Sequence, residues 1–149
     1  TGRIRQGATA IFLSPSVFQK DDQPTGWLPL DNKGSIANIS SWLYLTDVWA
    51  KNHPIFADLP AGGLLDYTFY RELIPAAVWV GQDPPAQAVA GSIKASQDYQ
   101  SGLILSVYKL GNGQIILNTL LIRENLGKHP AAERLLRNML RYAARGSHE

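Results

Sequence analysis

Two apolar runs on either side of a glycine-rich turn form the strongest pattern in the chain. The first run covers residues 103–108, the second covers residues 114–122, and a Gly-Asn-Gly segment lies between them at residues 111–113. Glycine and asparagine adopt positive φ at low cost, so the pattern predicts a β-hairpin. The second run hardly alternates between apolar and polar residues. This indicates a strand buried on both faces, with Ile116 and Leu117 pointing to opposite sides of the sheet.

An amphipathic helix is predicted to follow over residues 130–145. Pro130 suits the first helical position because an N–H there would have no helical partner, and Gly146 suits the left-handed position after the last turn. The apolar residues recur at three- and four-residue spacing: Leu135, Leu136, Met139, Leu140 and Ala143. The other face carries Arg134, Arg137, Arg141 and Arg145, with Glu133 one turn before Arg137. Such a face can meet nucleic acid or protein, but a solvated helix back explains it more simply.

The start of the chain predicts a short strand and then a long irregular excursion. Residues 8–13 are apolar, and Gly7 is placed to end a preceding helix. A helix end, a glycine and a buried strand form the second half of a β-α-β unit, so we expect the chain to be excised from a larger polypeptide. Residues 14–41 are rich in proline, glycine and polar side chains and predict little regular structure, with Trp27 and Leu28 inside the excursion.

A short helix is predicted after the excursion. Ser40 or Ser41 can cap a helix that ends at Asn52. On this helix Trp42 and Trp49 lie on one face, where packing in the core explains them better than a platform for sugars.

Two further strands are predicted at residues 76–80 and 86–95. The glycine pair at residues 62–63 predicts a turn before them. Trp79 lies within the first of these apolar runs and is predicted to belong to the core.

Composition limits the classes of function. The chain has 149 residues, 45% of them hydrophobic, which predicts one globular domain with a substantial core. Its 14 Lys+Arg and 12 Asp+Glu give a formal net charge of +2, too balanced to indicate nucleic acid or a membrane as partner. No apolar run approaches the ~18 residues that a membrane span needs. The absence of cysteine excludes disulfides, thiolate metal sites and a cysteine nucleophile.

Candidate catalytic groups are few and widely spaced. Ser14 and Ser16 follow a predicted buried strand, where α/β folds place their sites, but neither lies in a G-x-S-x-G turn. The histidines His53, His129 and His148 lack metal-ligand spacing, and His53 is predicted to be a loop or helix-end residue bonded to the backbone. No pair among the acidic residues is singled out for glycoside hydrolysis. We expect no cofactor and no metal.

The aromatic residues leave carbohydrate binding open, because their rings can stack on sugars. The candidates are four tryptophans and five tyrosines: Trp27, Trp42, Trp49, Trp79, Tyr44, Tyr67, Tyr70, Tyr99 and Tyr108. Among the tryptophans, only Trp27 has a loop context that favours exposure.

Two ordered stretches resemble bacterial glycoside hydrolases of the family 2 type. The first is W-A-K-N-H-P-I-F-A-D-L-P-A-G-G-L-L-D-Y at residues 49–67, followed by Tyr70-Arg71. The second is Y-K-L-G-N-G-Q-I-I-L-N-T-L at residues 108–120, followed by E-N-L-G and the arginine-rich helix. In those enzymes such a sequence belongs to an accessory domain with a class I glutamine-amidotransferase-like, flavodoxin-like fold.

The resemblance implies a three-layer α/β domain, incomplete at its N-terminus, that is a non-catalytic module of a carbohydrate-active enzyme. Its expected roles are domain packing, oligomerisation or the rim of a sugar site. The catalytic carboxylates of such enzymes lie in a separate β/α barrel, and the cysteine of amidotransferase relatives has no counterpart here. The implied partners are the rest of its own polypeptide or a second copy, and carbohydrate, in the cytoplasm or secreted with the parent enzyme.

Two alternatives remain at this point. One is an independent carbohydrate-binding module that uses Trp27 and neighbouring tyrosines. The other is a small serine hydrolase that uses Ser14 or Ser16. The residues predicted for sugar or interface contacts are Trp27, His53, Asp66 and Tyr70.

Overall fold

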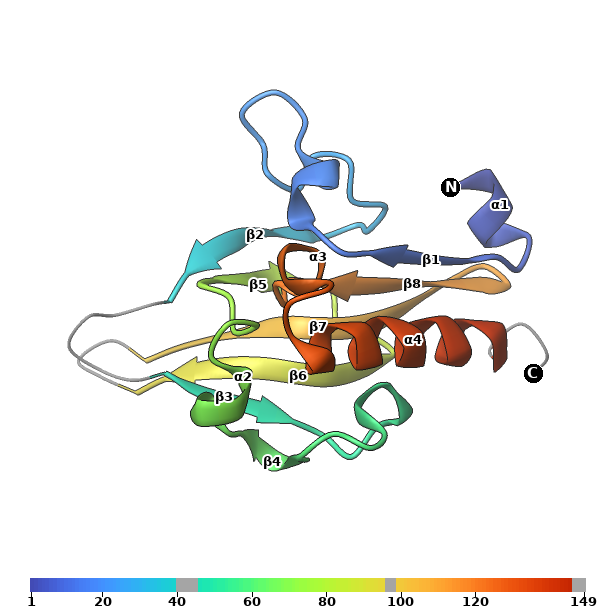
Figure 1. Cartoon of the computed structure of the whole chain (residues 1–149). Helices are drawn as coiled ribbons and strands as arrows, with labels where there is room; N and C mark the ends of the chain where they lie inside the picture. Colours follow the sequence, from blue (N-terminus) through green and yellow to red (C-terminus); the bar gives the residue numbers. More distant parts are fainter. Residues whose placement is uncertain (40–45, 96–98, 146–149) are drawn as a thin grey trace.

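A mixed β-sheet forms the centre of the structure (Figure 1). The computed structural model describes residues 1–39, 46–95 and 99–145, and eight strands lie within these residues. They are β1 (Thr9–Phe12), β2 (Lys33–Asn38), β3 (Asp47–Ala50), β4 (Ala61–Leu65), β5 (Ala77–Gln82), β6 (Gln87–Lys94), β7 (Gln100–Leu110) and β8 (Gly113–Asn118). The main path of the open sheet is β1-β8-β7-β6-β3-β4, and β5 joins β2 to β7. The chain is therefore a mixed α/β domain.

The hairpin and the two strands before it are confirmed. β7 and β8 pair antiparallel around the glycine turn, and β5 and β6 lie where residues 76–80 and 86–95 predicted strands. Every residue of β8 is buried. Ile116 and Leu117 are fully buried in clusters on opposite faces of the sheet. Among the described strand pairs, only β1 and β8 run parallel.

The helix α4 (Pro130–Arg145) covers one face of the sheet (Figure 1). It begins at Pro130 as predicted, and Leu135 and Met139 are fully buried against the sheet. Leu140 departs from the predicted apolar stripe and is 56% exposed. Asn138 takes a buried position instead, because its amide donates to the carbonyls of residues 55 and 57 at 3.0 and 2.9 Å. Gly146 lies outside the described residues.

Five short helical segments complete the described structure. They are α1 (Gly2–Arg5), α2 (Tyr67–Tyr70), α3 (Ile122–Asn125) and the 3-10 helices η1 (Pro15–Phe18) and η2 (Pro54–Phe56). Gly7 follows α1 with a φ of +120°, in agreement with its predicted place after a helix. In the described segments no helix is long and apolar enough to cross a membrane.

The helix predicted up to Asn52 is wrong where the structure describes it, because residues 47–50 form β3. Val48 and Ala50 are buried and Trp49 between them is half-buried, which is the two-residue period of a strand. Pairing with β4 and β6 on its two sides provides hydrogen bonds that the sequence pattern does not reveal. Trp42 lies outside the described residues. The predicted turn at residues 62–63 is wrong as well, since both glycines lie within β4.

The long excursion folds back onto its own sheet. Its first part, residues 14–32, is called the covering loop below, because Phe18 and Leu28 are buried against the sheet face opposite α4. They form a cluster there with Trp79, Tyr108, Ile115 and Leu117. Trp79 is 1% exposed, so its predicted place in the core is confirmed. The prediction of little regular structure is wrong for β2, which pairs antiparallel with β5.

Candidate functional site

The four residues predicted for sugar or interface contacts do not form one site. Trp27 lies in the covering loop and is 61% exposed, as its loop context predicted, with the Lys20 ammonium 4.8 Å from its ring centroid. Tyr70 lies in the cluster beneath α4, on the other side of the sheet. It is fully buried, and burial raises the pKa of its phenol to about 12. Tyr70 therefore presents no surface to a ligand.

Asp66 caps a helix. Its Oδ1 accepts a hydrogen bond of 2.9 Å from the backbone N–H of Thr68, at the start of α2. A carboxylate at this position satisfies a helix donor that would otherwise lack a partner.

His53 ties three elements together. Its Nδ1 accepts from the backbone N–H of Ile55 at 3.2 Å and so caps η2. Its Nε2 must then carry the proton, which it donates to Oε1 of Gln87 at 2.7 Å. The Tyr142 hydroxyl of α4 donates to the same oxygen at 2.8 Å. Burial lowers the pKa of His53, and the predicted bond to the backbone is confirmed.

The second His-Pro pair of the described chain works in the same way. His129 accepts from the N–H of Ala131 at 3.1 Å, one residue after Pro130, and its Nε2 donates to the carbonyl of Phe69 at 3.0 Å. Each histidine thus caps a helix and bonds to a second segment, and this structural role accounts for both side chains without a catalytic or metal-binding role. Residues 1–39, 46–95 and 99–145 contain no group of three His, Cys, Asp or Glu residues able to hold a metal ion.

Ser14 and Ser16 bond to each other. Their hydroxyls lie 2.9 Å apart, and Ser14 Oγ accepts from the N–H of Ser16 at 3.4 Å to cap η1. This geometry is that of a turn that begins a short helix, and it gives neither hydroxyl a base.

A pocket of about 350 Å³ lies on the sheet face opposite α4. Val48 and Ala50 belong to the cluster beneath α4, so Trp49 between them points to the opposite face. The aromatic and apolar part of the wall comes from Trp49, Trp79, Ile93, Tyr99 and Leu103, and polar side chains come from Gln82, Asp83 and Ser101. We call this hollow the Trp49 pocket.

A glycine makes room for the indole of Trp49. The strand pairing places Trp49 opposite Gly91, and Gly91 opposite Leu103. A Cβ atom on Gly91 would lie 2.4 Å from Cζ2 of Trp49 and 2.8 Å from the carbonyl oxygen of Gly102. The indole therefore lies directly against the backbone of β6.

Polar groups in the wall retain bonding capacity. Asp83 accepts from the backbone N–H of Asn32 through Oδ2 at 3.0 Å. Its carboxylate can accept further hydrogen bonds, since it offers about four lone-pair sites. Trp79, also in the wall, has a buried Nε1–H without a hydrogen-bond partner in the described structure. Lys51 lies beside the pocket with its ammonium 6.0 Å from the Trp49 ring centroid.

A second hollow, of about 530 Å³, lies within the covering loop. Lys20, Asp21, Asn32 and Lys33 contribute to its wall. The Lys33 ammonium donates to the carbonyl of Gly26 at 2.6 Å, and the Lys20 ammonium lies over Trp27. Both cations therefore already have contacts that stabilise the loop.

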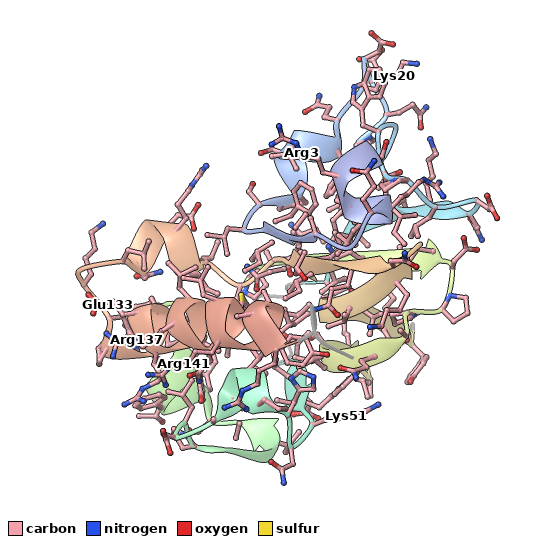
Figure 2. The ribbon with its side chains drawn as sticks, turned by 90° about the vertical axis from the view of Figure 1, so that its right-hand side faces the viewer. Arg3, Lys20, Lys51, Glu133, Arg137 and Arg141 are labelled. Atoms are coloured by element: carbon pink, nitrogen blue, oxygen red, sulfur yellow. The ribbon has the colours of Figure 1, made fainter. Side chains whose placement is uncertain are left out.

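Arg137 and Arg141 of α4 do not form one patch with Arg3, Lys20 and Lys51. Glu133, Arg137 and Arg141 follow one another along the outer side of α4 (Figure 2). Arg3 and Lys20 lie at the far end of the molecule in the same view, and Lys51 lies below. Arg134 pairs with Asp58 at 3.2 Å. This distribution agrees with a solvated helix back.

A scan against models of known protein families finds none that matches the chain, and a search of curated proteins finds no match. The family 2 resemblance therefore remains a prediction from the sequence.

Sequence reasoning placed Trp49 on a helix and so missed the pocket. Trp49 and Tyr99 were both among the candidate stacking residues, but nothing in the sequence joined them. The alternation of Asp47, Val48, Trp49 and Ala50 was the available signal, because it has the period of a strand.

Proposed function

We propose that the chain is a non-catalytic accessory domain of a carbohydrate-active enzyme similar to family 2 glycoside hydrolases. In this proposal the domain packs against the rest of that enzyme and contributes to the rim of a sugar site. The ordered resemblance of residues 49–71 and 108–140 supports the class of enzyme. The observation that carries the packing role is the edge of β1, which has no second partner strand among the described residues.

β1 has the surroundings of an internal strand. Ile11 packs against the cluster beneath α4, and Phe12 packs against the cluster beneath the covering loop, so both faces of the strand are covered. Its neighbour β8 runs parallel to it, and parallel strands occur almost only in sheets covered on both faces. Among the described strands β1 pairs with β8 alone.

The free edge of β1 is short, at four residues, and it carries no side chain that discourages pairing. Natural edges carry lysine, proline or a bulge that discourages pairing with another chain. The sequence of β1 is Thr-Ala-Ile-Phe, with none of these residues and a regular register over all four positions. Ala8 accepts from Gln114 of β8, so the alternating backbone groups of Thr9 and Ile11 point away from β8.

The finer fold follows as part of the proposal. We infer that the sheet continues beyond β1 with strands of the parent polypeptide, as in a three-layer flavodoxin-like, glutamine-amidotransferase-like domain. The parallel pair β1–β8, with α4 on one face, is the part of this structure that supports the inference.

The association of the isolated chain tests the packing role. With the edge of β1 free, light scattering of residues 1–149 should show association at micromolar concentration. Thr9→Pro removes one outward N–H and should reduce association, since proline cannot donate to an added strand. Thr9→Val keeps the N–H and a similar shape, and it should associate like the unsubstituted chain.

Two results would contradict the proposal. If the unsubstituted chain of residues 1–149 remains monomeric under these conditions, the edge of β1 does not accept a strand. Turnover of an aryl glycoside or a simple ester that survives repurification and disappears in Ser14→Ala would contradict the non-catalytic role.

An independent carbohydrate-binding module is the second candidate. The Trp49 pocket favours it, because an aromatic platform with polar neighbours is suited to sugars. The two candidates differ in the edge of β1: an independent module should remain monomeric while binding sugar.

A further inference from the structure

We propose that the Trp49 pocket binds one ring of a neutral hexopyranose, stacked against Trp49 and hydrogen-bonded to the polar wall. The place of this site within a larger enzyme rests on the proposed function. The class of ligand follows from the chemistry of the pocket.

Trp49 supplies a platform that is already in place. Its indole is half-buried and rests on Gly91, where any larger residue would displace it. Contact with the sheet on one side restricts the ring before a ligand binds, which lowers the cost of association. The C–H face of a pyranose is a suitable partner for such an aromatic surface.

Tyr99 supplies a second aromatic surface at the same hollow. Its side chain is 70% exposed although it is large and apolar over most of its area. Ile93 of β6 lies between Trp49 and Tyr99 on the same face of the sheet. It is paired with Asp47 on β3, the strand of Trp49, and with Ser101 on β7, which begins just after Tyr99. The volume of about 350 Å³ lies at the lower end of small-molecule sites and suits one sugar ring.

The polar side chains favour a polyol over a purely apolar ligand. Asp83 offers carboxylate acceptors, Ser101 offers a hydroxyl, and Gln82 offers what remains of its amide beside its hydrogen bond with Tyr108. Sugar hydroxyls donate and accept, so they can use all three. Charges of both signs lie at the pocket, since Asp83 is in its wall and the Lys51 ammonium is 6.0 Å from the Trp49 ring centroid, so we specify a neutral sugar.

The test is a titration of residues 1–149 with methyl glucoside, methyl galactoside and methyl mannoside, followed by NMR and tryptophan fluorescence. At least one should bind with a dissociation constant on the order of 1 mM, as expected for a single ring on an open site. The perturbed amides should map to β3, β6 and the start of β7.

Variants assign the binding to the pocket. Tyr99→Ala changes an exposed side chain and should weaken binding at least about 5-fold, while the NMR amide spectrum remains that of a folded protein. Trp49→Phe keeps a smaller platform and should weaken it by a similar factor. Trp27→Ala removes an exposed tryptophan outside the pocket and should leave the affinity unchanged.

Several results would overturn the inference. Failure of all three glycosides to saturate a signal would exclude a neutral hexopyranose site. Equal affinity in Tyr99→Ala, or an equal loss in Trp27→Ala, would place the ligand elsewhere. Saturable binding of a proline-rich peptide without sugar binding would make the hollow a peptide site. The association measured with Thr9→Pro is independent of these results, so each hypothesis can fail alone.

Discussion

The sheet face opposite α4 has two halves that share one row of paired residues but differ in burial. The row crosses six strands in the order Ile36, Trp79, Leu103, Gly91, Trp49 and Leu64. Trp79 is 1% exposed, whereas Leu64 at the end of the row is 63% exposed. The half around Trp79 is called the covered half and the half around Trp49 is called the open half.

The covering loop accounts for the difference. It places Phe18 and Leu28 on the covered half, where the ring centroids of Phe18 and Trp79 lie 5.9 Å apart. The open half has no such cover among the described residues: the Trp49 indole lies against Gly91, and a pocket is left beside the indole. Apolar surface of the same strands thus contributes to the core in one half and is available to a ligand or partner in the other.

The largest effect should come from truncation in the covered half. Leu28→Ala removes a fully buried side chain and should lower the free energy of unfolding by about 2–5 kcal/mol. Leu64→Ala is the matched control on the open half and should change it by less than about 0.5 kcal/mol. Urea unfolding followed by circular dichroism measures both. Equal losses would mean that the open half is also covered in solution.

A smaller effect should follow from filling the space beneath Trp49. Gly91→Ala introduces a Cβ atom where the indole and the backbone of Gly102 leave no room. The strain should cost about 1–3 kcal/mol and displace the indole. Urea unfolding gives the cost, and the near-ultraviolet circular dichroism of tryptophan reports the displacement. An unchanged spectrum and an unchanged free energy of unfolding would show that Trp49 does not rest on Gly91.

The smallest effect concerns pH and the α4 side of the sheet. The pKa of His53 is lowered in the folded state, so its contribution to stability is fully present above the unfolded value of 6.5. The contribution should be lost as the pH falls from 6.5 through the lower folded pKa. His53→Asn keeps a capping oxygen without a proton to gain, and its urea midpoint should vary less between pH 8 and pH 5.

A midpoint that varies equally in the two proteins would show that His53 does not contribute to the pH dependence. Sugar binding on the open half should not depend on His53, because the histidine reaches β6 through Gln87 and α4 through Tyr142.

Local sequence patterns were sufficient to predict an element where its apolar residues recur at a regular spacing and where turn or capping residues mark its ends. The β7–β8 hairpin was predicted because two long apolar runs flank a glycine turn, and α4 because its apolar positions recur between Pro130 and Arg145. The burial of Ile116 and Leu117 on opposite faces followed from a strand without alternation. Within α4, the pattern did not reveal Asn138 as a buried residue, because its partners are carbonyls far away in sequence.

The candidate site was predictable only as a set of residue types. Trp49 and Tyr99 could be recognised as rings able to stack on sugars, and Trp27 as an exposed one. The predicted contact residues His53, Asp66 and Tyr70 instead serve as caps or core, which depends on neighbours that only folding supplies. A four-residue strand such as β3 is too short for its own period to outweigh a helical interpretation.

The sequence by itself determined the hairpin, the amphipathic helix and the absence of cysteine chemistry, because each depends on residue type and spacing over a few turns or strands. Only the tertiary structure decided that residues 47–50 form a strand, that the covering loop buries Leu28, and that Gly91 lies under Trp49. The physical reason is that strand pairing and burial join residues that are 30 or more positions apart, as Trp49 and Gly91 are. No local period encodes that pairing.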